Sequence, residues 1–277
     1  MFTALRDHWP EYLIEAWGLG MFMVSAGVFA TLLYAPNSPA LGWVPNLFLR
    51  GTLMGIAMGL TAIAIIYSPW GKRSGAHINP AVTLAFFRLK KLAPWDALFY
   101  VVSQFIGGLA GVLLVAVLVG EAFTSIPVNY VVTVPGIWGW LAALITEALM
   151  SFGLMLMVLG VSNHPCWNQY TGVFSGVLVA TYITLAAPIS GMSINPARTF
   201  ASSLPAQVWT GFWIYYIAPP LAMLAATEIY LSRSQRPTRQ ICGKLCPNTE
   251  TGCIAPECGC VAFERKTAGM GSKGVMG

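Results

Sequence analysis

Long apolar stretches separated by short polar segments make up most of this chain. Averaged hydropathy predicts six membrane-spanning helices, near residues 12–34, 48–68, 95–119, 139–161, 170–189 and 207–231. Asp, Glu, Lys and Arg are absent between Glu121 and Glu147, and again between Glu147 and Arg198. A helix needs about 20 apolar residues to cross a hydrocarbon core roughly 30 Å thick. The pattern therefore predicts an all-α integral membrane protein that crosses the bilayer several times.

Composition agrees with this assignment and excludes other classes of protein. The chain is 56% hydrophobic and 9% charged, whereas an average soluble domain is roughly 25% charged. A soluble fold of 277 residues has no interior large enough for so much apolar surface. The net charge of +5 comes mostly from loops and the C-terminal region, so it indicates membrane topology rather than nucleic-acid binding.

A ten-residue segment occurs twice. Residues 74–83 read SGAHINPAVT and residues 190–199 read SGMSINPART, with seven of the ten positions identical. The copies follow the second and the fifth predicted spans, so each half of the chain holds three spans and one copy. An odd number of spans per half means that the halves, about 12–119 and 139–231, insert with opposite orientation, as an inverted repeat.

The repeated segments contain Asn79-Pro80-Ala81 and Asn195-Pro196-Ala197. Asn is among the best N-cap residues, and Pro is favoured at the first helical position. Each Asn-Pro pair therefore predicts the start of a helix. The first would cover about residues 79–90, or roughly 18 Å at 1.5 Å per residue, which crosses only half of a bilayer. We expect two re-entrant half-helices beside the six spans.

Half-helices that enter from opposite faces would meet near the midplane with their N-termini together. Each N-terminus carries about half a positive charge, so the meeting point would repel cations and protons. Asn79 and Asn195 would each cap their own helix and offer the NH2 group to a passing oxygen. The non-helical backbone at residues 75–78 and 191–194 is tolerated at this depth only where it lines a water-filled cavity.

Lysines and arginines predict the orientation. Arg6 precedes the first span, and the others cluster around the first repeat and after the last span: Lys72, Arg73, Arg88, Lys90, Lys91, Arg233, Arg236, Arg239 and Lys244. The loops near 35–47 and 120–138 carry only Glu121, and Arg50 is a minor exception. The positive-inside rule then places both termini in the cytoplasm, with the protein in the cell or inner membrane. We divide the chain into a cytoplasmic N-terminus (1–11), a channel domain (12–231) and a cytoplasmic, Cys-rich, partly disordered tail (232–277).

Over about residues 12–231 the chain resembles the aquaporin or major intrinsic protein family. The doubled Asn-Pro-Ala, the Ser-Gly-Ala-His before the first copy and Arg198 after the second carry the resemblance. It implies a homotetramer with one pore in each subunit, which passes water or small uncharged solutes passively across the lipid bilayer. It implies no cofactor for transport, and no catalytic constellation in the sequence indicates an enzyme.

The resemblance also implies a constriction formed by Met58, Ile183, Met192 and Arg198. Gly59 would replace Met58 if residues 68–73 contain no insertion. This set lacks the aromatic residue and the histidine that typify strict water channels of the family, and Thr199 stands where glycerol channels often have Asp. Methionine is flexible, so the ring would be apolar and adaptable. Residues 186–191 also look similar to the plant nodulin-like branch. We expect glycerol, urea or undissociated acids to pass alongside water.

Two glutamates in the predicted spans and a histidine before the first half-helix are further candidates for a function. Glu15 and Glu147 occupy equivalent places in the first and fourth spans. They could carry protons in a proton-coupled secondary transporter; the resemblance instead implies that each accepts hydrogen bonds from the loop before its half-helix, with Gln104 in the same scaffold. His77 could sense pH or pack as part of that scaffold.

Five cysteines follow the last span within 19 residues: Cys242, Cys246, Cys253, Cys258 and Cys260. Disulfides are uncommon in the cytoplasm, and cysteine thiolates bind zinc or an iron–sulfur cluster. Their spacing is not the paired C-x2-C pattern. A metal or redox site and a flexible thiol-rich tail remain alternatives, and in the first case the tail could be the active part of a membrane-anchored protein.

Overall fold

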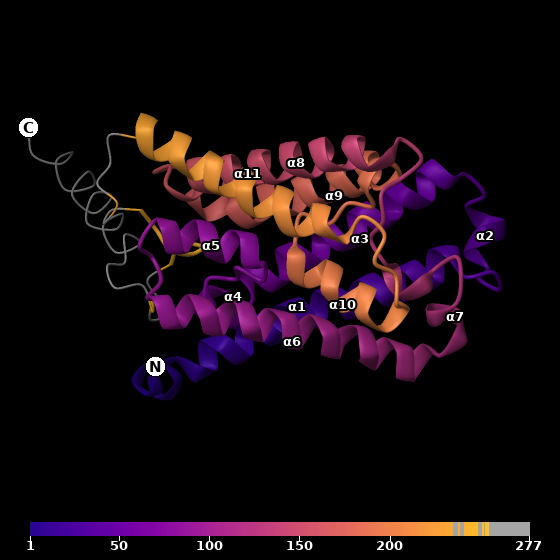
Figure 1. Ribbon diagram of the computed structural model, residues 1–277, viewed down its shortest axis with the longest axis horizontal. Coiled ribbons are helices and arrows are strands. Elements are labelled where there is room, and N and C mark those ends of the chain that lie inside the picture. Colours follow the sequence, from indigo (N-terminus) through magenta and orange to yellow (C-terminus); the bar gives the residue numbers. More distant parts are fainter. Residues whose placement is uncertain (235–237, 239–240, 249–250, 252, 255–277) are drawn as a thin grey trace, which may run out of the picture.

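The computed structural model describes residues 1–234, 238, 241–248, 251, 253 and 254. Within these residues the chain is helical, without strands, and six helices are long and apolar enough to cross a membrane. Those helices run side by side (Figure 1): α1 Phe2–Tyr34, α3 Leu47–Tyr67, α6 Pro94–Val119, α8 Gly139–Ser162, α9 Thr171–Ser190 and α11 Phe212–Arg233. The predicted all-α membrane architecture is confirmed.

Shorter helices lie between the long ones. Two of them, α5 (Pro80–Arg88) and α10 (Pro196–Ala206), begin at the repeated Asn-Pro pairs as predicted. The rest are connecting turns: α2 Ala40–Trp43, α4 Pro69–Ser74, α7 Glu121–Thr124 and two 3-10 segments, Asn129–Val131 and Asn168–Tyr170. At 1.5 Å per residue α5 is roughly 14 Å long, which is too short to span a bilayer.

Two helix boundaries differ from the hydropathy prediction. α1 begins at Phe2 rather than near residue 12, because hydropathy marks the apolar stretch and not the polar turns that continue the same helix. α11 begins at Phe212 rather than near residue 207. α10 ends at Ala206, and Gln207 (φ 54°) and Gly211 (φ 65°) turn the chain before α11 can start.

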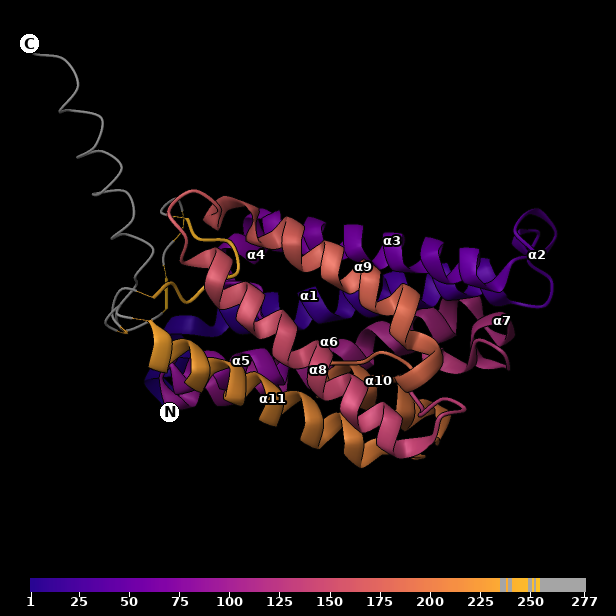
Figure 2. The same cartoon turned by 90° about the horizontal axis from the view of Figure 1, so that it is seen from above.

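The two halves of the chain are built alike and are interleaved. α1 packs against α6 in the first half, α8 packs against α11 in the second, and α3 and α9 join the halves. Each half-helix packs on a long helix of the other half: α5 lies against α11, and α10 lies against α6 (Figures 1 and 2). Each half-helix is therefore held in place by the opposite half.

Glycines allow α3 and α9 to approach each other closely. A Cβ atom on Gly59 would lie 2.5 Å from the carbonyl oxygen of Gly176, and one on Gly55 would lie 2.5 Å from that of Ala180. Small residues at such contacts let helix backbones pack directly in a membrane. The interface between the halves thus depends on these side chains being absent.

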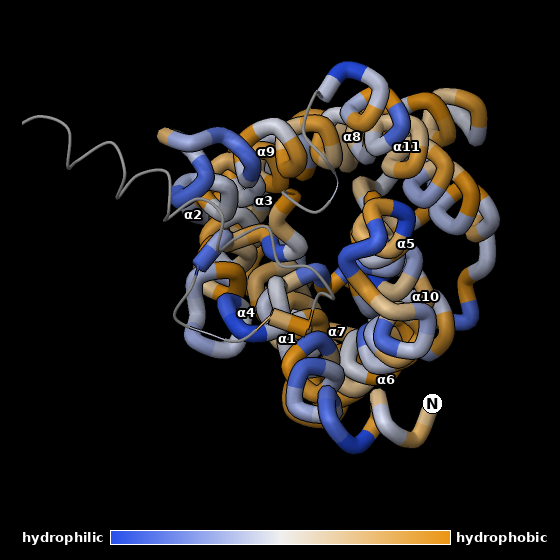
Figure 3. The backbone as a smooth tube through the Cα atoms, turned by 90° about the vertical axis from the view of Figure 1, so that its left-hand side faces the viewer, coloured by the Kyte–Doolittle hydropathy of each residue, from blue (hydrophilic) through white to orange (hydrophobic). Residues whose placement is uncertain are grey.

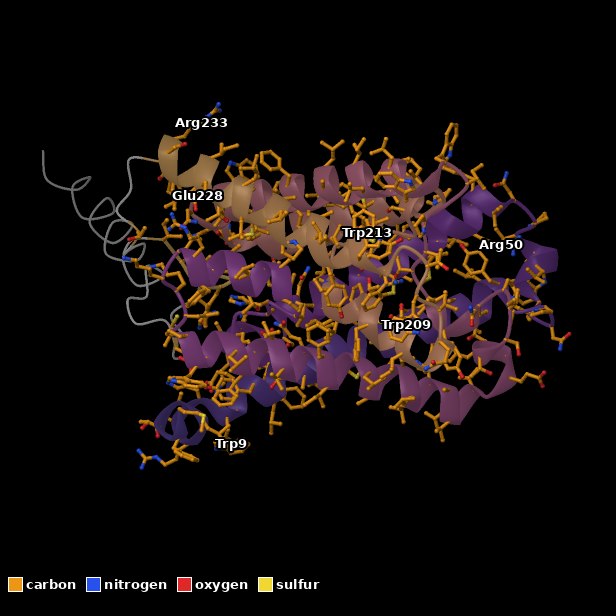
Figure 4. The ribbon with its side chains drawn as sticks, in the orientation of Figure 1. Trp9, Arg50, Trp209, Trp213, Glu228 and Arg233 are labelled. Carbon is orange, nitrogen blue, oxygen red and sulfur yellow. The ribbon has the colours of Figure 1, made fainter. Side chains whose placement is uncertain are left out.

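The outer face of the bundle is apolar, as a bilayer requires. Figure 3 looks along the bundle from one end and shows hydrophobic stretches on all its sides. On α6, for example, large apolar side chains are exposed: Ile106, Leu113, Leu114, Val117 and Leu118. Trp9 and Arg233 lie near one end of the bundle and Arg50 lies near the other (Figure 4). We call these the tail end and the Arg50 end.

Candidate functional site: the axial cavity between the half-helices

Each half-helix starts at an asparagine that caps it. The Asn79 side-chain oxygen accepts a hydrogen bond from the backbone N–H of Ala81 (2.9 Å). The Asn195 oxygen accepts from Ala197 (3.1 Å) and from Arg198 (3.2 Å). These bonds satisfy N–H groups that the first turn of a helix leaves without partners.

The amide nitrogens of the same two asparagines connect the halves of the chain. Asn79 Nδ2 donates to the carbonyl oxygen of Ile194 (2.7 Å), and Asn195 Nδ2 donates to that of Ile78 (2.8 Å). From the sequence we expected each asparagine to offer its NH2 group to a passing solute. The structure gives one of its two N–H donors to the opposite half, which fixes where the two helix N-termini meet.

The backbone before each asparagine is held in an unusual conformation. Ala76 (φ 52°) and Ile78 (φ 40°) adopt left-handed geometry in the first loop, as do Met192 (φ 48°) and Ile194 (φ 51°) in the second. Such φ values are uncommon outside glycine, and a β-branched residue such as Ile rarely adopts them. The surrounding contacts must therefore impose this conformation.

Glu15 supplies those contacts for the first loop. Its carboxylate accepts hydrogen bonds from Ser74 Oγ (2.8 Å), the backbone N–H groups of His77 (3.0 Å) and Ile78 (2.6 Å), and Gln104 Nε2 (2.8 Å). Both carboxylate oxygens are thus occupied by donors from the loop and its surroundings. This arrangement matches the structural interpretation of Glu15 better than that of a proton carrier.

Glu147 holds the second loop in the same way. It accepts from Ser190 Oγ (2.8 Å) and from the backbone N–H groups of Ser193 (2.9 Å) and Ile194 (2.6 Å). Both Glu15 and Glu147 are completely buried. The two glutamates thus occupy equivalent positions in the two halves.

A cavity of about 130 Å³ runs past this meeting point. A water molecule needs roughly 10–15 Å³ of such space, so the cavity has room for several. Both asparagines and all four residues expected at the constriction line it: Met58, Ile183, Met192 and Arg198. Gly59, the alternative to Met58, instead packs against Gly176 of α9.

Sequence reasoning missed several residues on the cavity wall. Met54 lies one helical turn before Met58 on the same face of α3, so the spacing of four residues could have indicated it. Phe22 of α1 also lines the cavity, and no sequence signal distinguishes it from the other apolar residues of that helix.

Arg198 is the one charged residue on the cavity wall among the residues that the structure describes. Its Nη1 atom is buried and has no hydrogen-bond partner within the described part of the chain. A buried donor without a partner costs free energy of about 1–3 kcal/mol or more. Other parts of the Arg198 side chain are partly exposed, and the guanidinium carries further N–H donors for a polar solute in the cavity.

Comparison with known proteins agrees with this architecture. The family model described as major intrinsic protein matches residues 5–230. The chain belongs to this family. It is similar to a probable aquaporin AqpM of Archaeoglobus fulgidus, with 38% identity over 64% of this chain and 74% of the relative. It is also similar to a probable NIP-type aquaporin of Nicotiana alata, with 32% identity over 67% of this chain and 68% of the relative.

The fold has a counterpart among solved structures. An X-ray structure of the aquaglyceroporin from Plasmodium falciparum matches with a TM-score of 0.65, over 81% of this chain and 96% of that one, at 19% identity. That likeness concerns the fold alone. Together with the family match it shows that the chain is a membrane channel of the aquaporin type.

His77, next to the first aquaporin motif, is fully enclosed. Its ring stacks on Phe86 (4.6 Å between centroids) and lies edge-on to Tyr100 (5.4 Å). Nε2 lies 3.1 Å from the carbonyl oxygen of Gly243, in the segment that follows α11. These contacts fit a scaffold residue and connect the loop to the tail of the chain.

The cysteines expected to bind metal are only partly within the described residues. Cys242 and Cys246 are buried, whereas Cys258 and Cys260 lie outside the described part of the chain. Cys242 is disulfide-bonded, so its sulfur is not a thiolate ligand. Among the described residues, which include Cys253, no three His, Cys, Asp or Glu side chains come together to hold a metal ion. The zinc or iron–sulfur site stays a prediction.

Proposed function

We propose that this channel passes water and small uncharged solutes such as glycerol, urea or undissociated acids down their gradients. The observation that carries the proposal is Arg198 on the cavity wall together with the apolar side chains of Met58, Ile183 and Met192. The guanidinium group can bind a hydroxyl or carbonyl oxygen. The side chains of Met58, Ile183 and Met192 leave an adaptable apolar surface for the carbon atoms of the solute.

Ion and proton exclusion follows from the charges along the same cavity. The N-termini of α5 and α10 each present about half a positive charge where the cavity passes them. The remaining N–H groups of Asn79 and Asn195 are donors, so a water molecule there is oriented with its oxygen toward both. A cation at this point meets positive potential from the helix ends and from Arg198.

We also propose the homotetramer and the orientation that the resemblance and the positive-inside rule imply. Arg88 forms an ion pair with Glu228 (2.6 Å), and Glu228 lies at the tail end in Figure 4. The C-terminal segment contacts Lys72 at the same end. A tail end that faces the cytoplasm would agree with the excess of lysine and arginine there.

Light scattering on proteoliposomes tests the substrate proposal. Water efflux and glycerol uptake are compared with empty vesicles, for the natural chain and for Arg198→Ala. We expect glycerol uptake above that of empty vesicles, and a proton or cation leak only with Arg198→Ala. Water flux without glycerol uptake would contradict the apolar, adaptable constriction, and the channel would then be selective for water.

A further inference from the structure

The chain returns to the cavity after its last membrane helix. α11 ends at Arg233, and residues 241–246 are all buried again at the tail end of the bundle. Figure 2 shows this segment in yellow beside α4. Ile241 and Leu245 join the same apolar cluster as Val82 and Phe86 of α5. A surface tail would not be expected to bury six consecutive residues in this way.

Hydrogen bonds attach the segment to the loop that precedes the first half-helix. Leu245 N–H donates to the carbonyl oxygen of Gly75 (3.0 Å), and His77 Nε2 lies 3.1 Å from the oxygen of Gly243. A Cβ atom on Gly75 would lie 3.2 Å from that same Gly243 oxygen. The backbone of the segment therefore lies directly on the backbone of the pore loop.

Further contacts hold the segment on either side of this point. Cys242 N–H donates to Asn163 Oδ1 (3.0 Å) at the end of α8. On the other side, Asn248 Nδ2 and Thr251 Oγ1 each donate to the carbonyl oxygen of Lys72, both at 3.0 Å. Lys244 is buried and donates from Nζ to Thr251 Oγ1 (3.0 Å). The segment is thus bound to both halves of the bundle.

Leu245 contributes its side chain to the wall of the cavity itself. It lines the cavity together with Ile66 of α3 and Val158 of α8, which belong to the tail end of those helices. An isobutyl group has no donor or acceptor, so it cannot replace the hydrogen bonds that a water molecule gives up on passing it. A segment that is not part of a membrane helix therefore adds apolar surface to the cavity at its tail end.

We propose that residues 241–246 are an autoinhibitory plug that closes the tail end of the pore, and that its release opens the channel. The inference rests on the proposed function, because only a conducting pore can be closed. The plug is part of the same chain, so it is present at every pore whatever the concentration of other proteins. Because Leu245 lies on the cavity wall, the channel passes little water while the plug is bound there, and more once the plug is released.

The test compares water permeability of proteoliposomes that contain the full chain, Leu245→Glu, Thr238→Glu, or a chain truncated after Ser234. Leu245→Glu places a charge against an apolar wall and leaves residues 1–234 unchanged. Thr238→Glu is the matched control, because Thr238 is exposed and lies in the same connecting region. We expect Leu245→Glu and the truncation to raise water flux by roughly tenfold or more, since a minor open state is populated at about 10% or less. Thr238→Glu should behave like the natural chain.

Two results would overturn the plug, and they have different meanings. If all four proteins pass water equally and well above empty vesicles, the tail does not close the pore and the channel function stands. If all four are folded and inserted, by circular dichroism and vesicle flotation, yet none exceeds empty vesicles, both the plug and the proposed function fail.

Discussion

Asn79 and Asn195 donate to each other's loops: each side-chain amide binds the carbonyl oxygen of the residue immediately before the other asparagine, at 2.7 and 2.8 Å. Each half of the chain therefore provides one donor and one acceptor to the other half. They hold the ends of α5 and α10 against each other at the centre of the cavity. The positive ends of two helices repel each other, so these bonds oppose that repulsion and keep both ends at the same point.

Asn79→Asp removes one of these donors and places two oxygens opposite each other. A buried acceptor left without its donor costs about 1–3 kcal/mol, whereas a negative charge at a helix N-terminus returns only about 0.3–1 kcal/mol. We therefore expect a lower thermal unfolding temperature. The new negative charge should also admit protons, which a pH-sensitive dye inside vesicles would detect. Asn46→Asp is the control, because Asn46 caps α3 at an exposed position. Equal stability of the two variants would contradict the role of the reciprocal bonds.

Glu147→Gln tests whether this carboxylate is a scaffold or a proton carrier. The amide places an NH2 group where a carboxylate oxygen accepted from backbone N–H donors. Hydrogen bonds to charged groups are worth about 1.5–3 kcal/mol each, so we expect a large loss of stability. Glu228→Gln should change stability little, because its ion pair with Arg88 is exposed. The natural protein's solute flux should be independent of a proton gradient. Flux that follows the gradient would instead support the secondary transporter.

Gly59→Leu tests the close contact between α3 and α9. Its Cβ would lie 2.5 Å from the Gly176 oxygen and 3.0 Å from the Ala180 Cβ. Overpacking of this kind costs about 1–3 kcal/mol or more, and the helices would have to separate next to Met58. We expect lower stability and altered glycerol flux. A methyl group on Gly51 in the same helix would meet nothing within 4 Å, so Gly51→Ala should be neutral or slightly stabilising. If Gly59→Leu changed neither the stability nor the glycerol flux, the interface between α3 and α9 would have relaxed to accept the larger side chain.

Reduction of the disulfide at Cys242 should weaken the plug. A cross-link restricts the states available to a released segment, so breaking it favours release over the seated state. We expect water flux of the natural chain to rise when the vesicles are treated with a thiol reductant. Cys242→Ser should already show the higher flux and should not respond further. If the reductant increases the number of free thiols in the natural chain but leaves its water flux unchanged, the disulfide does not control the plug.

Much of the fold follows from local sequence signals. Six apolar stretches predict the spans because a bilayer demands long apolar helices, and Asn-Pro predicts the start of α5 and α10 because both residues favour that position. The constriction residues follow from the family resemblance combined with positions relative to the two repeated segments. Each of these signals is contained in a short segment or in the repeat.

What the sequence does not reveal depends on contacts between distant segments. The bond from Asn79 to Ile194 joins residues 115 positions apart, and no local pattern encodes it. The plug has only Ile241 and Leu245 as large apolar side chains among residues 241–246. The segment is buried because it packs and forms hydrogen bonds with the backbone of Gly75 and with Asn163 at the end of α8. Such complementarity is visible only once the helices are placed.

Each half-helix packs against a long helix of the other half, and this arrangement bears on the order in which the protein is assembled. α5 belongs to the first half of the chain, yet it rests against α11, the last long helix. During synthesis the first half therefore enters the membrane before α11, against which its half-helix packs most extensively, has been made. The support of α5 is complete only when the final span has been inserted, so the last helix to be synthesised holds in place a half-helix that was synthesised near the start.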